Sequence, residues 1–473
     1  MQEHLSRNER DELNELLRQY NNIRNGKSHS FLEEEAFERI IDYFDDKDNL
    51  AQALEAAETG LEYFPYSSQL LIKKADLLIA TRHYREALEI LEKASLFNTN
   101  EINIYILKTD AYLALDEQAN AVALLEEALL LFDGEEKIEL LFELADVYDD
   151  YEEFDKVFDC LKIILTHEPN NEEALYKICF WTDFTGRNEE SIRLHHSIIE
   201  DYPYNELAWF NMASAYQGLK LYEKAIDAYQ YAVAIDEKFD YAYRNMGDAY
   251  IRLRKYKDAI ETLEKVLELT RPEEVIYEAI GHCYYRLGKH AQARFNYRKA
   301  SHMNPDDSKL YYKIALTYIN ESQWSSALKP LEQAMRIHRN MPDYNLAIGE
   351  CYMNLEKFRE AIQHFSIVVR SKPRNVSGWE SLIRCLYKAG YFEEASRQCI
   401  SALQGTENKP VFYYLYSAVL FALGKHKDAL LQLETGLSLA PKLVKKFLEL
   451  NPSILQNNGV VDLLARYKKR KKI

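Results

Sequence analysis

The feature that most constrains this chain is a small side chain that returns at an almost constant spacing. Alanine occupies the position ten times, and Val157 and Ser191 each occupy it once. Ten of the eleven steps are 34 residues long, and the step from Ala121 to Val157 is 36. The alanines are Ala53, Ala87, Ala121, Ala225, Ala259, Ala293, Ala327, Ala361, Ala395 and Ala429. A fixed period of this length indicates an array of one supersecondary unit, repeated twelve times.

The stretch YEAIGHCYYRLGKHAQARFNYRKASHMNP, residues 277–305, shows why the position stays small. It is rich in helix-forming residues, and its small residues fit a close crossing of two helices. Helix axes that approach to roughly 8–10 Å leave room only for small side chains. We therefore expect Gly281 and Ala293 at the crossing, Ala300 against the next hairpin, and the end of the second helix at Pro305.

This pattern resembles the tetratricopeptide repeat, in which W-x₂-L-G-x₂-Y, A-x₃-F and Pro recur over 34 residues. Related stretches begin at Trp209 (WFNMASAYQGLKLYEKAIDAYQYAVAIDE), Tyr243, Tyr311 and Asn345. The resemblance implies an all-α fold, a right-handed α-solenoid superhelix of stacked helical hairpins with helical caps.

The repeat register divides the chain into three parts. Residues 1–33 are predicted to form a capping helical segment, residues 34–443 twelve repeats, and residues 444–473 capping helices and a basic tail. Within the last part, residues 443–450 and 460–467 are the expected helices. The tail, KKRKK, fits a solvated end, a nuclear signal, a membrane-surface contact or an RNA contact.

Composition limits the class of partner and the compartment. A formal net charge of −17 argues against nucleic acid as a partner, because a polyanion is repelled. No run approaches the roughly eighteen apolar residues that a membrane-spanning helix needs. The polar beginning lacks the apolar core of a signal peptide, and the six cysteines form no C-x-x-C pair. We expect a cytoplasmic protein without a cofactor.

No constellation of residues indicates catalysis or metal binding. The quoted segments hold no phosphate-binding glycine loop, nucleophile elbow or H-E-x-x-H motif. The pair His195–His196 lacks a further ligand at fixed spacing, and Cys283, Cys351 and Cys385 share a repeat position where other repeats have alanine. We therefore predict that the chain is not an enzyme and that these cysteines are small buried residues.

The resemblance also implies where a ligand would bind, because first helices line the concave face in this family. Its variable positions are the second, fifth, sixth, ninth, twelfth and thirteenth of each repeat. In the first five repeats they are strongly acidic, with Arg39, Lys73 and Lys177 as the cations. The acidic residues are Glu35, Glu38, Asp42, Asp45, Asp46, Asp76, Asp110, Glu139, Glu143, Asp146, Asp149, Asp150, Glu173 and Asp183.

Later repeats carry cations, tyrosines and two asparagines at these positions. Tyr176, Phe180 and Phe184 precede them at i, i+4 and i+8, so their rings share one helix face. These rings either meet a ligand or pack on neighbouring helices. The candidate peptide-binding set is Tyr176, Phe180, Phe184, Phe210, Asn211, Tyr241, Arg244, Asn245, Arg252, Tyr285, Arg286, Tyr312 and Lys313.

The sequence thus predicts a non-enzymatic scaffold that binds a peptide or helix of a partner protein in the concave groove. The partner is expected to carry an acidic part for repeats seven to nine and a basic part for repeats one to five. The alternative is a regulatory or assembly subunit that acts through self-association or by docking to an enzyme complex. The sequence sets no oligomeric state.

Overall fold

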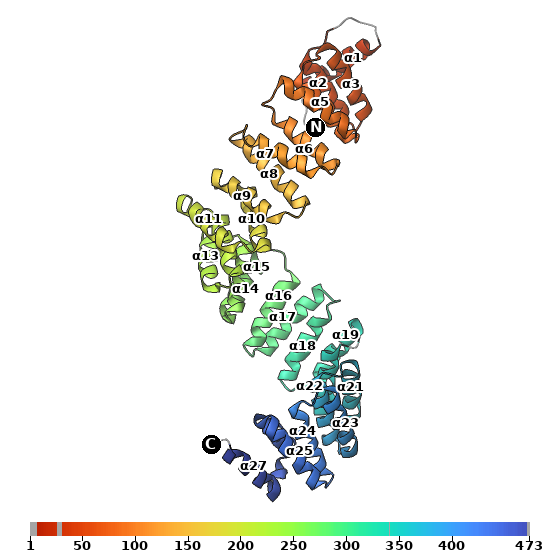
Figure 1. Cartoon of the computed structure of the whole chain (residues 1–473), viewed down its shortest axis with the longest axis vertical. Helices are drawn as coiled ribbons and strands as arrows, with labels where there is room; N and C mark the ends of the chain where they lie inside the picture. The colour runs from red at the N-terminus through yellow and green to blue at the C-terminus, as the bar shows by residue number, and fades with distance from the viewer. Residues whose placement is uncertain (1–6, 26–30, 340, 471–473) are drawn as a thin grey trace. The chain divides into compact units, whose positions relative to one another are not determined.

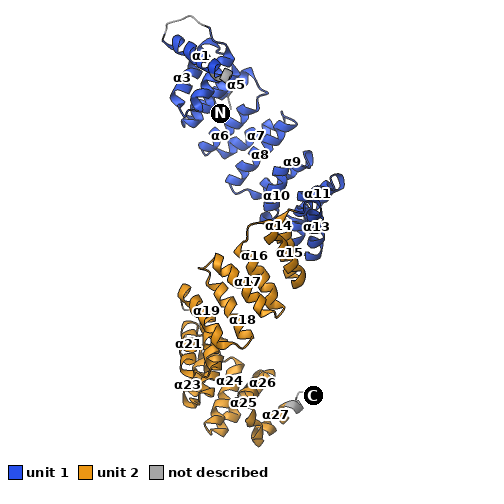
Figure 2. Ribbon diagram, turned by 180° about the vertical axis from the view of Figure 1, so that it is seen from behind, with its two compact units in different colours: residues 1–237 blue, residues 238–473 orange. Residues whose placement is uncertain are grey.

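The computed structural model describes residues 7–25, 31–339 and 341–470, and all the regular secondary structure in these ranges is helical. Figure 1 shows the helices following one another as antiparallel neighbours. The chain divides into two compact units, residues 1–237 and 238–473 (Figure 2). Residues 1–6, 26–30 and 471–473 of the two predicted ends lie outside the described residues, as do the side chains of 7–10 and 468–470.

Unit 1 contains a first helix and six helical pairs. Its helices are α1 Arg7–Arg24, α2 Glu34–Asp45, α3 Leu50–Tyr63, α4 Ser68–Ala80, α5 Tyr84–Phe97, α6 Ile102–Ala114, α7 Gln118–Ala128, α8 Glu135–Asp150, α9 Phe154–His167, α10 Glu172–Thr185, α11 Asn188–Asp201, α12 Glu206–Gly218 and α13 Tyr222–Ile235.

Unit 2 contains six further pairs and the C-terminal helices. Its elements are α14 Asp240–Arg252, α15 Tyr256–Leu269, α16 Glu274–Arg286, α17 His290–Met303, α18 Ser308–Asn320, α19 Trp324–Ile337, α20 Pro342–Asn354, α21 Phe358–Ser371, α22 Val376–Lys388, α23 Phe392–Gly405, α24 Pro410–Ala422, α25 His426–Leu439, η1 Pro441–Leu443, α26 Val444–Leu450, η2 Pro452–Gln456 and α27 Asn458–Arg470. Each even-numbered helix from α2 to α24 is the first helix of a hairpin, and the next helix is the second.

A tight turn with one left-handed residue joins the two helices of each hairpin. Glycine, which adopts positive φ without a steric penalty, fills this place in only four hairpins. The turn residues are Asp48, Arg82, Asp116, Glu152, Gly186, Lys220, Arg254, Gly288, Ser322, Glu356, Gly390 and Gly424. Because the φ values repeat with the sequence period, the turn between the two helices has the same conformation in every hairpin.

The small residues lie at close helix crossings, as the sequence predicts. Ala293 and Ala300 are fully buried. A Cβ atom added to Gly281 would lie 2.7 Å from a ring carbon of Tyr297, closer than real Cβ contacts. Gly349 is equally close to Phe365. The all-α array of stacked hairpins is confirmed, and side-chain volume at these crossings sets how closely the helices pack.

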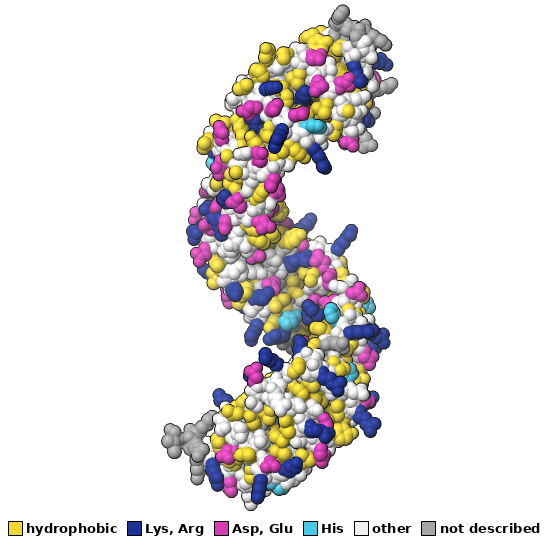
Figure 3. Space-filling view, turned by 45° about the vertical axis from the view of Figure 1, so that its right-hand side comes forward, with side chains coloured by type: hydrophobic (Ala, Val, Ile, Leu, Met, Phe, Trp, Pro, Cys, Tyr) yellow, Lys and Arg dark blue, Asp and Glu magenta, His cyan; other side chains and the backbone are white. Residues whose placement is uncertain are grey.

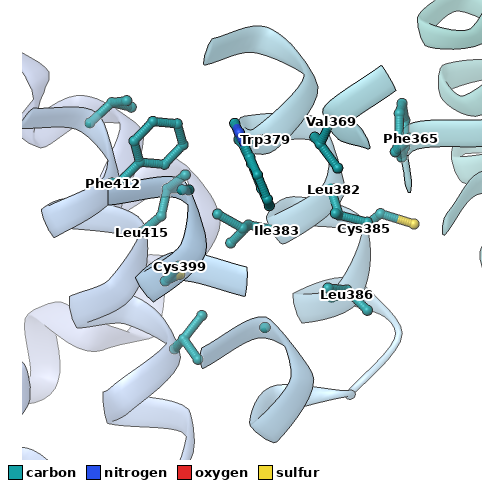
Figure 4. Packing of buried hydrophobic residues seen from close by; sticks show 14 of the residues in the cluster. Phe365, Val369, Trp379, Leu382, Ile383, Cys385, Leu386, Cys399, Phe412 and Leu415 are labelled. Carbon is teal, nitrogen blue, oxygen red and sulfur yellow. The ribbon is translucent and has the colours of Figure 1, made fainter. Parts of the chain in front are cut away.

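Large apolar side chains from successive hairpins fill the spaces between the crossings. In unit 2, Phe365, Trp379 and Phe412 come from three neighbouring hairpins and belong to one buried cluster, with Cys385 and Cys399 beside them (Figure 4). Cys283, Cys351 and Cys385 are all fully buried. Burial raises the pKa of Cys283 and Cys351 to about 12, so these thiols are protonated and inert at neutral pH.

Helices outside the repeats cover both ends of the hairpin series. Tyr20 of α1 is buried with its ring edge against Phe37 of α2. At the other end, Phe447, Ile454 and Val460 are buried in a cluster with residues of α24 and α25. The helices fall where the sequence places them, and the assignment of the two ends as separate capping domains stays a prediction.

Candidate peptide-binding surfaces

Carboxylates form a row across the first helices of unit 1. Asp76 of α4, Asp110 of α6 and Glu143 of α8 all have carboxyl pKa values raised above the ordinary range. Reduced hydration is the largest cause in each case. Repulsion is next, from Asp45 on Asp76, from Asp76 on Asp110, and from Asp110 on Glu143. Each carboxylate is therefore close enough to its neighbour to destabilise its charge.

Lysines form ion pairs with carboxylates at both ends of this row, whereas the carboxylates between them have no ion pair. Lys73 pairs with Asp42, and Lys177 pairs with Glu173 at 2.9 Å and with Asp146 at 3.6 Å. Lys73 and Lys177 also offset part of the raised pKa of Asp76 and Glu143, respectively. Within the described ranges, Asp76, Asp110 and Glu143 make no ion pair or hydrogen bond. We call these three residues the acidic row.

An exposed aromatic patch lies on α10, beyond the acidic row in the repeat order. Tyr176, Phe180 and Phe184 are 62%, 60% and 58% exposed. Phe180 and Phe184 stack with ring centroids 5.9 Å apart, and Phe154 of α9 meets Phe184 edge-on at 4.7 Å. Phe184 thus contacts both Phe180 and Phe154, and most of the surface of the three α10 rings stays open to a ligand. These four residues form the aromatic patch.

The fifth hairpin is built differently from the others. Trp181 takes the place of a small residue, is buried and stacks on Phe154 at 5.2 Å. Consequently α10 packs mainly on α9 and α12, and only lightly on its own partner α11. The Trp181 ring thus joins α10 to the preceding hairpin, and the exposed aromatic patch lies beside this contact.

Asn211 does not belong to the candidate site, because it is used inside unit 1. It is 2% exposed, and its amide donates to the carbonyl oxygen of Leu175 at 2.8 Å and to Nε2 of His195 at 3.2 Å. Burial lowers the pKa of His195 to about 4, so the ring is neutral, and Nδ1 donates to the carbonyl oxygen of Ser191. The sequence places Asn211 in the candidate peptide-binding set, but its amide is buried and already hydrogen-bonded.

In unit 2, three of the four predicted cations already have carboxylate partners. Arg244 binds Glu273 through two hydrogen bonds of 2.6 and 3.1 Å. Lys313 pairs with Glu278, and Nε of Arg252 lies 3.3 Å from Asp248. Arg286 makes no ion pair with a described carboxylate, and its guanidinium lies 5.6 Å from the ring centroid of Tyr256.

The remaining predicted residues are also largely engaged. Phe210 is half-buried, and its ring lies 5.7 Å from that of Tyr229 in unit 1. In unit 2, the Tyr285 hydroxyl accepts from Asn320 at 2.8 Å, and Tyr312 packs on Tyr344 at 5.1 Å. Tyr241 is 62% exposed, while Asn245 is half-buried. Unit 2 therefore brings few free groups together on its first helices.

The face of the molecule shown in Figure 3 carries charges of both signs. Figure 3 shows basic side chains (dark blue) and acidic side chains (magenta) interspersed with apolar ones on the face in view. Among the described residues, no group of three or more His, Cys, Asp or Glu side chains is placed to hold a metal ion. None of the described helices combines the length and the hydropathy needed to cross a bilayer. Whether a charged side chain is available to a ligand therefore depends on its own ion pairs.

Sequence reasoning overlooked Phe154, whose ring completes the aromatic patch. An aromatic residue begins the second helix in several other hairpins, as at Tyr84, Tyr222 and Tyr256. Nothing in the sequence marks Phe154 apart from these. Its role follows from its contacts with the rings of Trp181 and Phe184, which only the structure shows.

Comparison with known proteins agrees with this architecture. The model of a family described as tetratricopeptide repeat matches residues 222–407, which confirms the resemblance seen in the sequence. A search of curated protein sequences finds no match. Many solved structures match, and three of them, all at low identity, are described next.

The first is YrrB, described as a tetratricopeptide-repeat protein with an unusual peptide-binding site. It is 19% identical with a TM-score of 0.35, over 39% of this chain and 95% of YrrB. The C-terminal part of a repeat protein from Cytophaga hutchinsonii is 18% identical with a TM-score of 0.45, over 51% and 99%. The Cut9–Hcn1 hetero-tetramer of APC/C is 15% identical with a TM-score of 0.35, over 92% and 96%.

Proposed function

We propose that this chain, a tetratricopeptide-repeat array, is a non-enzymatic scaffold that binds a basic segment of a partner protein along the first helices of unit 1. Arrays of this kind offer extended surfaces for protein–protein interaction. The observation that carries the proposal is the acidic row: neighbouring carboxylates that repel one another and make no ion pair. Cationic side chains of a ligand would remove that repulsion on binding.

The repeat register supports a single binding surface. Asp42, Asp76, Asp110 and Asp146 occupy the same repeat position in four successive hairpins, and Phe180 occupies it in the fifth. A partner that follows this position meets carboxylates first and then the aromatic patch. Exposed aromatic rings supply apolar contact area at low entropic cost, which is typical of binding hot spots.

The spacing of the hairpins indicates the pattern of the ligand. Packed helices lie roughly 8–10 Å apart, and an extended chain rises about 3.3 Å per residue. Lysine or arginine at about every third residue would therefore meet successive carboxylates of the acidic row. An apolar or aromatic side chain beyond the basic stretch would reach Tyr176, Phe180 and Phe184.

The acidic half of the expected bipolar partner has weaker support. A ligand carboxylate would have to compete with Glu273 for Arg244 and with Glu278 for Lys313. We therefore propose a basic partner that is bound in the cytoplasm. In that compartment the six cysteines would stay free thiols, as they are in the structure. The alternative, an assembly subunit that self-associates, predicts a stable oligomer in sedimentation at several concentrations.

The test is fluorescence anisotropy with a labelled peptide that carries lysine at every third position and a C-terminal phenylalanine. Asp76→Asn with Asp110→Asn should weaken binding roughly tenfold, which corresponds to about 1.4 kcal/mol. Glu86→Gln with Glu89→Gln removes the same charge from exposed positions of α5 and serves as the matched control. Equal affinities for the two double variants would refute the acidic row as the binding surface.

A further inference from the structure

A cavity of about 760 Å³ lies in unit 2 between the second helices α17 and α19, with α18 beneath them. It is separate from the first-helix surfaces described above. Tyr311, Ile314 and Tyr318 of α18 contribute its apolar side. Arg294, paired with Glu321, lies 4.1 Å from the ring centroid of Tyr318 and fixes that ring in place. The cavity therefore has an ordered aromatic floor.

Three exposed cations surround this floor. Arg298 of α17, Lys329 and Arg336 of α19 all line the cavity, with Glu332 as its one acidic residue. Arg298 donates to the Tyr318 hydroxyl at 2.7 Å. None of the three makes an ion pair with a carboxylate in the described ranges, in contrast to Arg244 and Lys313. The cavity wall therefore keeps an uncompensated positive charge in a chain whose net charge is −17.

A second cavity continues the first across α19. It has a volume of about 510 Å³ and shares Glu332 and Arg336 with its neighbour. Arg339 adds a fourth cation, and Tyr352 adds an aromatic wall that stacks on His364 with centroids 5.8 Å apart. Because Glu332 and Arg336 of α19 line both cavities, the two lie side by side along this helix, one toward α17 and the other toward α21. We call the two cavities together the second-helix groove.

Helix α19, which lies between the two cavities, also offers a hydrogen-bond acceptor. Pro330 lies inside α19 and has no N–H, so the carbonyl of Ser326 lacks the donor that a regular helix supplies. Ser326 and Pro330 both line the first cavity. A peptide N–H could therefore be satisfied at the wall, between the cations.

We propose that the second-helix groove binds an acidic peptide segment of a partner protein that also carries apolar side chains. Charge complementarity selects the acidic residues, because four cations face one carboxylate. Arginine can grip a carboxylate through two hydrogen bonds, and the tyrosine floor accepts a leucine or an aromatic ring. Acidic residues about three positions apart would match the distance between neighbouring second helices.

A peptide fits these observations better than a nucleic acid. The net charge of the chain repels a long polyanion, and the groove is bounded by α17 and α21 rather than extended as a basic stripe. Its apolar floor is also better matched to side chains that alternate with carboxylates. The site is independent of the proposed function, since it lies in unit 2 and selects the opposite charge.

The experiment measures anisotropy of a labelled nine-residue peptide with glutamate at every third position and leucine and tyrosine between. We expect binding to the full-length protein, no binding of the peptide with glutamine in place of glutamate, and no competition by a single-stranded oligonucleotide. Lys329→Glu with Arg336→Glu should reduce affinity at least tenfold. The milder Lys329→Gln with Arg336→Gln should reduce it less, and circular dichroism confirms that both variants are folded.

The matched control is Lys257→Glu with Lys427→Glu, which reverses two exposed cations on other second helices of unit 2. Its affinity for the glutamate peptide should equal that of the native protein. The proposal is wrong if the glutamate peptide does not bind, if both charge-reversed proteins lose affinity equally, or if the oligonucleotide displaces the peptide. Concentration-dependent association of the protein that the glutamate peptide abolishes would also overturn it, because a second copy would then occupy the groove.

Discussion

In unit 1 the carboxylates Asp76 and Asp110 make no ion pair, whereas in unit 2 Arg244 and Lys313 are each held by a glutamate. Both sets lie on the first helices of their hairpins. A count of charges in the sequence makes the two sets look like equivalent halves of one polarised groove. The ion pairs show that the two sets differ, because Arg244 and Lys313 have carboxylate partners, whereas Asp76 and Asp110 have no described cation paired with them.

The difference matters more for binding than for stability. An exposed ion pair contributes only about 0–1 kcal/mol to folding. A ligand that uses Arg244, however, must replace the two hydrogen bonds to Glu273 before it gains any. A ligand that uses the acidic row replaces nothing but water, and it relieves repulsion among the carboxylates.

The largest expected effect tests whether the two units respond independently. Ala293→Leu should overpack a close helix crossing in unit 2 and destabilise the neighbouring hairpins by about 1–3 kcal/mol. Thermal unfolding followed by circular dichroism should show an earlier transition. Binding of the basic peptide below that transition should be unchanged, and its loss would mean that unit 1 depends on unit 2.

Next in size is the contribution of the aromatic patch. Tyr176→Ala with Phe180→Ala should weaken the basic, phenylalanine-containing peptide by roughly 30-fold, about 2 kcal/mol. Because both rings are largely exposed, the melting temperature should hardly change. Tyr312→Ala in unit 2 is the contrasting variant: this ring is packed on Tyr344, so it should lower stability and leave peptide binding intact.

Reversing the paired cations should have a smaller effect, confined to stability. Arg244→Glu with Lys313→Glu places glutamates opposite Glu273 and Glu278, and we expect a loss of about 1 kcal/mol from like-charge contacts. Affinity for the basic peptide, measured by anisotropy, should stay within a factor of two. A tenfold change in that affinity would show that the cations of unit 2 take part in the same site.

The smallest effect concerns the pH dependence of stability. The folded state raises the carboxyl pKa of Asp76 and Asp110, so it binds protons more tightly than the unfolded state. Their ionisation therefore destabilises the fold, and this cost disappears as pH falls through the raised pKa toward the ordinary value near 4.

Asp76→Asn with Asp110→Asn should accordingly melt about 1–2 °C higher than the native protein at pH 7, from a gain below about 0.5 kcal/mol. The difference should vanish near pH 4. Scanning calorimetry at several pH values would check this. An equal difference at both pH values would mean that repulsion within the acidic row is not its cause.

Much of the fold could be predicted because packing follows the repeat. Gly281 and Ala293 mark helix crossings by their size alone, and the structure confirms them. The partners of Arg244 could not be predicted in the same way, since Glu273 stands 29 residues on and just before the next first helix. The regular spacing of equivalent repeat positions does not reveal a contact between residues at two different positions.

The fifth hairpin shows a second limit of sequence reasoning. Trp181, Thr182 and Ser191 differ from the residues usual at their repeat positions, so the sequence marks this hairpin as irregular. These differences do not predict how its helices pack. In the structure Trp181 stacks on Phe154 of α9, α10 packs only lightly on α11, and Asn211 of α12 is hydrogen-bonded to the buried His195. Asn211 stands at a variable repeat position, yet it is buried. The ring of Phe154, in contrast, contacts the exposed aromatic patch.

The central claim is that the acidic row is a cation-binding surface, and the carboxyl pKa of Asp110 tests it most directly. It can be followed by NMR of the full chain labelled at the aspartate carboxyl carbon, with and without the basic peptide. The account predicts a pKa above the ordinary aspartate value in the free protein and a fall on peptide binding, because a nearby cation stabilises the carboxylate. An ordinary pKa in the free protein, or a raised one that the bound peptide leaves unchanged, would contradict it.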